Sequence, residues 1–136
     1  MESFEQRPQL PETGATASRI SRRIVQLHAK LYGRGPTKAK TFLEHEYALC
    51  ILEEVFTTAE NTLIAAGRGD HVQATRLAFQ QAVEDQFIAI LEEETQRSVR
   101  ALVSQVHLPS NLSVELFLFA PDGGSTQGSD GNRPDG

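Results

Sequence analysis

The stretch from Gly33 to Lys40, Gly-Arg-Gly-Pro-Thr-Lys-Ala-Lys, holds the residue types best suited to binding an anion. Its two glycines permit unusual backbone angles that expose N–H groups, and its cations can neutralise a bound charge. It is not a Walker loop, because the spacing differs and no strand precedes it. A helix end followed by a proline turn explains the same residues, so both interpretations stay open. The candidate ligand- or partner-binding residues are Gly33, Arg34, Gly35, Pro36, Thr37, Lys38 and Lys40, with Arg68 from a second loop, Gly67-Arg-Gly69.

Other chemically reactive side chains are scattered along the chain. The four histidines, His28, His45, His71 and His107, show no metal-ligand spacing. Cys50 lies inside an apolar run, where burial raises the pKa of a thiol and slows its chemistry. The chain also lacks a Gly-x-Ser-x-Gly elbow. We therefore predict no enzyme activity, no catalytic residues, no metal site and no cofactor.

Composition narrows the class of protein further. The chain has 136 residues, with Lys+Arg 13 against Asp+Glu 18 and a net charge of −5. That balance argues against a nucleic-acid partner, whose binding needs a basic face. A single cysteine fits a reducing compartment, and the longest apolar run, residues 47–52, is far short of the roughly 20 residues of a membrane span. We expect a soluble cytoplasmic protein.

The two ends of the chain differ from its middle. Residues 1–16 show no periodicity, and residues 121–136 are rich in Gly and Asp, so we predict disordered tails around one domain over residues 17–120. The tails carry most of the negative charge. The domain itself begins with a locally basic surface over residues 19–40.

Hydrophobic spacing predicts the first helix and the helices in the middle of the chain. Apolar residues recur on one helical face over residues 18–32, and Gly33 then ends the helix. Thr57 and Glu60 have the spacing of a capping box, which predicts a short helix to about residue 66. Asp70 and Gln73 offer a second capping signal for a long helix. The apolar stripe of that long helix is Val72, Phe79, Val83, Phe87, Ile90 and Leu91.

Four strands complete the domain. Residues 37–43 and 47–52 favour two strands joined at Glu44-His-Glu46, although their composition also suits a helix. Apolar alternation over residues 99–106 and 112–119 predicts two more, joined by a hairpin at residues 107–111. The predicted fold class is α+β, a single domain of order α-β-β-α-α-β-β, with a four-stranded, mostly antiparallel sheet backed by helices.

The order and spacing of these pieces resemble one bacterial family. The Gly-x-Gly-Pro-Thr-Lys-Ala-Lys stretch, the apolar strand, Thr57-x-x-Glu60, Arg76, and Val114-Glu-Leu-Phe-Leu118 resemble the Na+-translocating system MpsC-type domain, long catalogued as a domain of unknown function. The resemblance spans residues 18–120. The chain departs from it at Phe56, where Leu is expected, and at Gln96, where Gly is expected.

The resemblance implies a role in a bacterial membrane-potential-generating system linked to inorganic-carbon uptake. It implies a non-catalytic accessory or regulatory protein, peripheral at the inner face of the membrane, that acts by protein–protein interaction. The expected partners are a second copy of the chain, forming a homodimer, and integral antiporter-like membrane subunits. The alternative hypothesis is a sensor that binds a small anion or a nucleotide at the Gly33–Lys40 loop.

Overall fold

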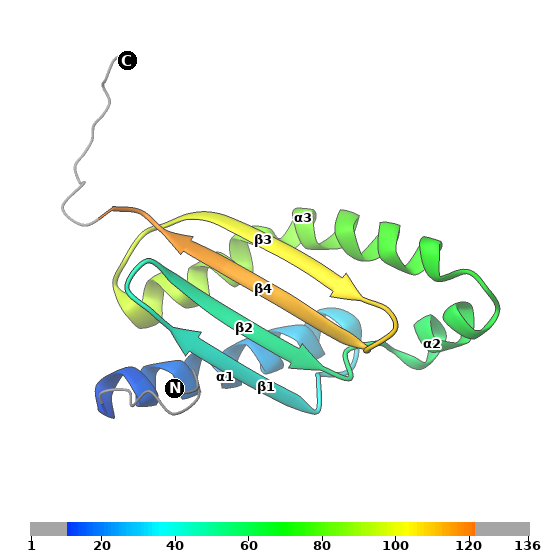
Figure 1. Cartoon of the computed structure of the whole chain (residues 1–136), viewed down its shortest axis with the longest axis horizontal. Helices are drawn as coiled ribbons and strands as arrows, with labels where there is room; N and C mark the ends of the chain where they lie inside the picture. The colour runs from blue at the N-terminus through cyan, green and yellow to red at the C-terminus, as the bar shows by residue number, and fades with distance from the viewer. Residues whose placement is uncertain (1–10, 122–136) are drawn as a thin grey trace, which may run out of the picture.

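Three helices and four strands follow one another in the predicted order over residues 11–121, the part of the chain that this computed structural model describes (Figure 1). The predicted α+β class is confirmed. The predicted C-terminal tail lies outside the described residues, except for its first residue, Pro121. The bounds of the elements are α1 Pro11–Tyr32, β1 Lys38–Leu43, β2 Tyr47–Glu53, α2 Thr58–Ala65, α3 Gly69–Thr95, β3 Val99–His107 and β4 Leu112–Phe119.

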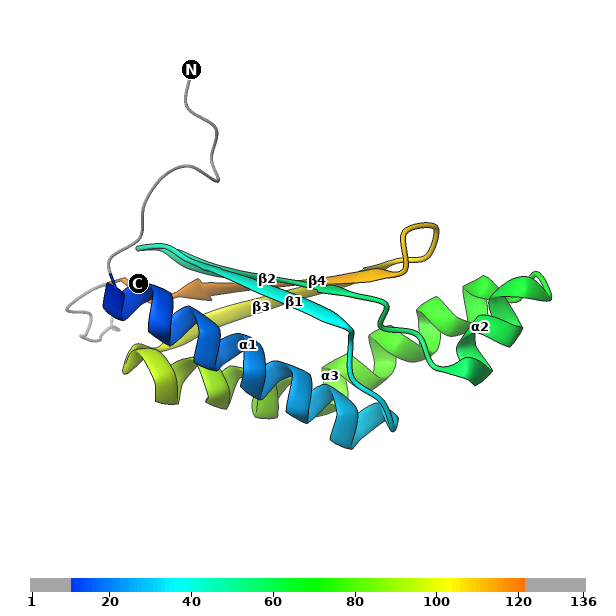
Figure 2. The same cartoon turned by 90° about the horizontal axis from the view of Figure 1, so that it is seen from below.

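The four strands form one sheet in the order β1-β2-β4-β3, and every neighbouring pair is antiparallel. The predicted hairpins at residues 44–46 and 107–111 are confirmed. After β2 the chain passes through α2 and α3 and returns in β3 at the far edge, and β4 then fills the place beside β2. α1 and α3 lie side by side on one face of the sheet (Figure 2). Among the described residues, no helix covers the other face.

The first helix begins earlier than predicted. It starts at Pro11 rather than near Ser18, so residues 11–16 are helical, and the predicted disordered tail over residues 1–16 is wrong for that part. Residues 1–10 lie outside the described residues. Proline suits the first turn of a helix, where its missing N–H needs no partner. The added turns carry a hydrogen bond from Arg19 Nη2 to Thr16 Oγ1, 3.1 Å long.

The core lies between the two long helices and the inner face of the sheet. Ile20 and Ile24 of α1 are fully buried, as are Phe87 and Leu91 of α3. The predicted stripe of α3 is confirmed, with Phe79 half-buried at its edge. Truncating one of these large core side chains to alanine typically costs about 2–5 kcal/mol. The sheet and the β2–α2 connection add Ala48, Cys50, Leu52, Val55, Phe56, Phe117 and Phe119.

The start of α2 follows the predicted capping box. Thr57 Oγ1 accepts from the Glu60 N–H at 3.1 Å, and Glu60 Oε1 accepts from the Thr57 N–H at 2.9 Å. The second predicted capping signal, at Asp70 and Gln73, is wrong. α3 begins at Gly69, and the residue before it makes no side-chain cap. Asp70 therefore lies in the first turn, where its charge interacts favourably with the helix dipole.

Candidate functional site

The predicted loop over residues 33–40 shapes the connection between α1 and β1. Gly33 has a φ of +89°, a left-handed conformation that suits glycine at a helix end. A Cβ on Gly35 would lie 3.1 Å from Val25 Cγ1, so the backbone passes tightly against α1. Pro36 is buried. These three positions therefore have a structural role, whatever else the loop binds.

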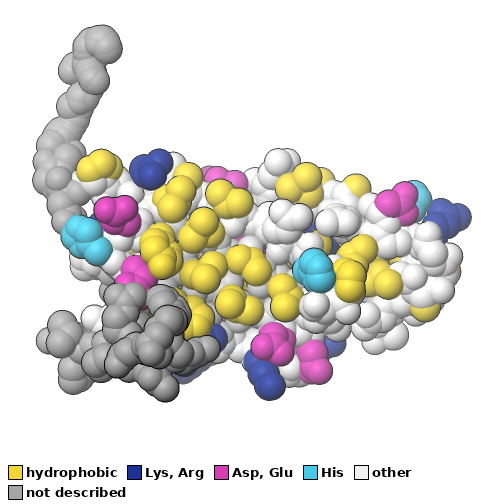
Figure 3. Space-filling view, viewed as in Figure 1, with side chains coloured by type: hydrophobic (Ala, Val, Ile, Leu, Met, Phe, Trp, Pro, Cys, Tyr) yellow, Lys and Arg dark blue, Asp and Glu magenta, His cyan; other side chains and the backbone are white. Residues whose placement is uncertain are grey.

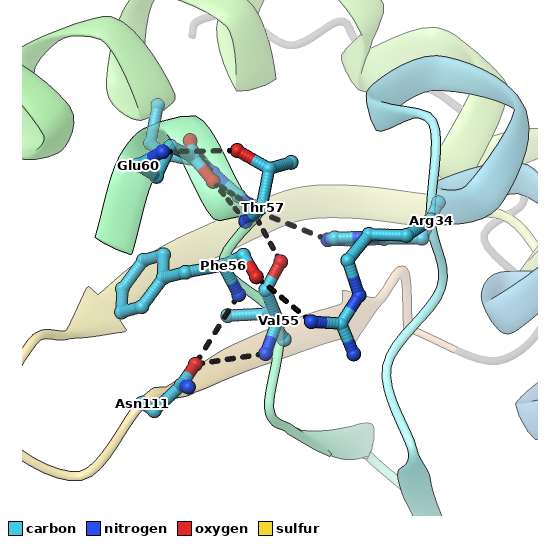
Figure 4. A network of polar contacts seen from close by, with 8 residues as sticks. Arg34, Val55, Phe56, Thr57, Glu60 and Asn111 are labelled. Carbon is cyan, nitrogen blue, oxygen red and sulfur yellow. Dashed lines mark hydrogen bonds and ion pairs between the residues drawn. The ribbon is translucent and has the colours of Figure 1, made fainter. Parts of the chain in front are cut away.

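Two polar side chains of the loop contact the connection between β2 and α2. Arg34 Nη1 donates to the Phe56 carbonyl at 2.9 Å, and the Thr37 hydroxyl donates to the Glu54 carboxylate. The guanidinium of Arg34 reaches across to that connection in Figure 4. Both side chains thus help to hold two segments of the chain together.

The remaining candidate cations are exposed, and the fold separates them. Lys38 and Lys40 lie on β1, and Lys40 Nζ is 5.6 Å from the centre of the Phe42 ring. Arg68 lies between α2 and α3, with Nη1 3.3 Å from His71 Nε2. Figures 1 and 2 both show the α2–α3 connection well away from the start of β1, so Arg68 does not join the loop. A binding role for the eight candidate residues stays a prediction.

The basic surface predicted over residues 19–40 is partly neutralised by the end of α3. Arg19 Nε lies 2.8 Å from Glu94 Oε1. Arg23 bridges two carboxylates, at 2.7 Å from Glu93 Oε1 and 3.2 Å from Glu94 Oε2. These acidic side chains therefore join α1 to α3.

The sheet face turned away from the helices is strongly apolar. Leu49, Leu116 and Val103 are successive neighbours across β2, β4 and β3, and Val103 is 53% exposed. Figure 3 shows apolar side chains gathered over the middle of this face. Its apolar residues, here called the outer apolar face, are Phe42, Tyr47, Leu49, Ile51, Ala101, Val103, Leu112, Val114, Leu116 and Leu118.

The inner face of the same sheet carries a polar row beneath the helices. Thr41, Cys50, Glu115 and Ser104 stand at one level of the strand register. Thr41 Oγ1 lies 3.3 Å from Cys50 Sγ, and Ser113 Oγ donates to Glu115 Oε2 at 2.6 Å. Burial raises the pKa of the Cys50 thiol to about 12, which confirms the expected unreactive environment. The buried inner face thus carries polar groups of its own among its apolar residues.

Arg76 on α3 is the centre of a buried polar network. Its side chain is 4% exposed, and its Nε and Nη2 donate to the two carboxylate oxygens of Glu60 at 2.7 and 2.6 Å. Nη2 also donates to the Val55 carbonyl at 2.8 Å, and Nη1 lies 3.2 Å from His28 Nε2. The guanidinium carbon is 3.9 Å from the centre of the Tyr32 ring. One side chain therefore links α1, α3 and the start of α2.

The network fixes the protonation of its members. Because the guanidinium only donates, His28 Nε2 must accept, so the ring proton lies on Nδ1. Burial and the charge of Arg76 lower the pKa of His28 to about 4. Burial opposes ionisation of Glu60, but hydrogen bonds from Arg76 and from the Thr57 backbone outweigh it and lower the pKa. The network thus holds one neutral imidazole beside one matched ion pair.

The β2–α2 connection is held by side chains from three other parts of the fold. Asn111 in the β3–β4 hairpin accepts from the Val55 N–H at 2.9 Å and the Phe56 N–H at 3.2 Å through Oδ1 (Figure 4). Arg34 donates to the carbonyl of Phe56, and Arg76 donates to the carbonyl of Val55. The loop after α1, the first half of α3 and the β3–β4 hairpin therefore meet at this connection.

Sequence reasoning missed most of this polar centre. Arg76 entered it only through the family resemblance, and Gln80 and Glu115 were not singled out. Arg76 and Gln80 follow Val72 at intervals of one helical turn, which places them on its buried face. That spacing was the available signal, because a charged residue inside an apolar stripe must find a partner when it is buried.

Within residues 11–121, no group of three or more His, Cys, Asp or Glu side chains could hold a metal ion. No helix in that same range is long and apolar enough to cross a membrane.

Comparison with known proteins gives one match. The family model described as Na+-translocating membrane potential-generating system (MpsC) matches residues 12–121. No curated protein and no solved structure matches the chain. The family match begins and ends close to the limits of α1 and β4, so it covers the whole fold described above. The chain therefore belongs to the MpsC family.

Proposed function

We propose that this chain is a non-catalytic accessory component of a cation-coupled membrane-potential system and acts by protein–protein contact at the inner face of the membrane. The family match supports a place in such a system. The observation that carries the contact role is the outer apolar face. Exposed apolar patches of this kind mark interaction sites, because water covers them at a cost in free energy.

The occupant that we assign to this face is a second copy of the chain. Two sheets pack well face to face at about 10 Å, with their side chains interdigitated. The sheet has four strands, which at a spacing of about 4.8 Å and a length of about 23 Å give a flat area of roughly 450 Å². This flat area is a little over half of the roughly 800 Å² per partner of a standard interface, so residues at the rim of the sheet must contribute the rest of the contact.

A dimer of this kind leaves charged groups for the membrane subunits. Lys38 and Lys40 lie on the edge strand β1, at the border of the outer apolar face. They therefore stay hydrated at the rim of the dimer, where they can meet an acidic surface on an integral subunit. This arrangement gives two of the candidate residues a role in contacting a partner.

Sedimentation of the full chain tests the dimer. Wild type is expected to sediment as a dimer at micromolar concentrations. Val103→Glu should raise the dissociation constant by at least about tenfold, since it buries a charge in the interface. Leu63→Glu is the matched control, because Leu63 is 41% exposed but lies on α2, away from the sheet. A wild-type monomer, or equal dissociation of the two variants, would contradict the assignment.

Cross-linking in native membranes tests the accessory role separately. Lysine-reactive cross-links from Lys38 or Lys40 to an integral antiporter-like subunit are expected, and co-purification of that subunit should be lost in the Lys38→Glu/Lys40→Glu variant. Lys30→Glu, on the last turn of α1, is the control. Recovery of links only between copies of this chain would leave the dimer intact and overturn the place in a membrane system.

A further inference from the structure

A pocket of about 400 Å³ lies between the first half of α3, the end of α1 and the inner face of β3 and β4. Gln73, Leu77 and Gln80 line it from the helix, and Ser104 and Glu115 line it from the sheet. The volume lies within the range of small-molecule sites, near its lower end.

The pocket contains buried polar groups that lack partners. Oε1 of Glu115 and Nε2 of Gln80 make no hydrogen bond among the described residues, and these residues are only 2% and 8% exposed. A buried polar atom without a partner is costly, and most such atoms in native proteins are satisfied. With Nδ1 of His28, three such atoms belong to residues that line this one pocket, which indicates a missing ligand rather than a packing detail. The amide of Gln80 can present its oxygen in place of its nitrogen by turning about its last bond.

The charges around Glu115 determine which kind of ligand fits. The charge of Arg76 is already matched by the bidentate carboxylate of Glu60, and His28 is neutral. Two more titratable side chains lie near Glu115. Tyr32 on α1 lines the pocket, and Cys50 on β2 is the neighbour of Glu115 in the strand register; burial raises the pKa of both. Asp70 adds a second carboxylate to the lining.

Glu115 therefore lacks a cation of its own. Burial raises the pKa of its carboxyl to about 7, although the hydrogen bond from Ser113 and the charge of Arg76 oppose the rise. An anionic ligand would be repelled by the carboxylates of Glu115 and Asp70. The charge of Arg76 would not offset this repulsion, because Glu60 already neutralises it. A ligand with a cationic N–H group would supply the missing counter-charge.

We propose that this pocket binds a small organic cation, an amine, amidine or guanidine, which donates to Glu115 Oε1. The apolar body of the ligand packs between Leu77 of α3 and Val106 of β3, which face the same pocket. The Gln80 carboxamide oxygen accepts a second N–H. This site is independent of the outer apolar face, because it lies on the opposite side of the sheet.

Calorimetry of the full chain with three ligands of the same shape tests the proposal. Benzamidine is cationic, benzamide is neutral and benzoate is anionic. Benzamidine is expected to bind at millimolar concentrations or below, at least about tenfold more tightly than the other two. Its affinity should rise between about pH 6 and pH 8, as the carboxyl loses its proton. Equal affinities for the three ligands, or no binding of benzamidine at millimolar concentrations, would overturn the proposal.

Two kinds of variant locate the binding. Glu115→Gln keeps the shape of the side chain and removes its charge, so benzamidine affinity should fall at least about tenfold and lose its pH dependence. Ala74→Trp fills the pocket from an exposed position on α3 and should block binding, whereas Ala78→Trp, exposed on α3 outside the pocket lining, should leave it unchanged. Unchanged affinity in both Glu115→Gln and Ala74→Trp would show that benzamidine binds elsewhere and would overturn the assignment.

Discussion

Arg76 and Glu60 form a bidentate ion pair that joins the first half of α3 to the first turn of α2. The same carboxylate completes the capping box with the Thr57 backbone. Glu60 thus serves two purposes, since it begins one helix and neutralises the buried cation of another. The groups that contact Arg76 come from α1, α2 and the β2–α2 connection, so its removal disturbs several elements at once.

Arg76→Ala should destabilise the fold by about 3 kcal/mol or more, because it leaves a mostly buried carboxylate without its cation. Urea unfolding of wild type and variant measures this difference. Arg19→Ala is the control: Arg19 also pairs with a glutamate, but it is 48% exposed, so its loss should cost about 1 kcal/mol or less. Similar losses of unfolding free energy in the two variants would show that the buried ion pair stabilises the fold no more than the exposed one does.

Two groups around Arg76 give opposite contributions to the pH dependence of stability. The pKa of Glu115 is raised to about 7 in the folded state, so the fold binds its proton more tightly than the unfolded chain does. Stability from this group is present at low pH and is lost as the pH rises from about 4.5 to 7. The pKa of His28 is lowered to about 4, so its contribution is lost as the pH falls from about 6.5 to 4.

Unfolding at several pH values should therefore show a nearly flat wild-type profile between about pH 4.5 and 6.5, where the two contributions cancel. Glu115→Gln should become more stable as the pH rises through that range, by up to about 1.4 kcal/mol per pH unit. His28→Gln should show the opposite slope. Parallel profiles for the two variants would contradict the shifts in pKa.

Gln96→Gly should stabilise the protein by about 0.5–1 kcal/mol, because Gln96 ends α3 with a φ of +58°, in the left-handed region. This is the position where the family resemblance leads us to expect glycine. Gly33→Ala is the matched opposite case. Its φ is +89° and nothing lies within 4 Å of the added Cβ, so its cost reflects backbone conformation alone. Thermal unfolding of both variants should shift in opposite directions.

Cys50 should not react with a thiol-specific reagent such as Ellman's reagent in the native protein at neutral pH. Its side chain is fully buried, and its pKa of about 12 leaves almost no thiolate. The reaction rate should follow the population of opened molecules and rise steeply in denaturant. A fast native reaction that is insensitive to denaturant would show that the polar row on the inner face is accessible.

Local features of the fold could be predicted from the sequence. The capping box at Thr57, the helix end at Gly33 and the turns at residues 44–46 and 107–111 depend on hydrogen bonds and backbone angles within a few residues. Apolar spacing predicted the buried stripe of α3, because residues three and four positions apart lie on the same face of a helix. The start of α1 was missed because residues 11–16 carry little apolar spacing.

Which face of the sheet is buried could be decided only by the tertiary structure. In β4 both phases of the alternation are apolar, with Leu116 and Leu118 on one side and Phe117 and Phe119 on the other. The helices cover the side of β4 that also holds Ser113 and Glu115. The side of β4 on which every residue is apolar is left open. Alternation shows that two faces exist, but the choice between them depends on where α1 and α3 pack. The sequence by itself determined the elements and their order, whereas the packing of helices on one face created the pocket, the Arg76 network and the outer apolar face.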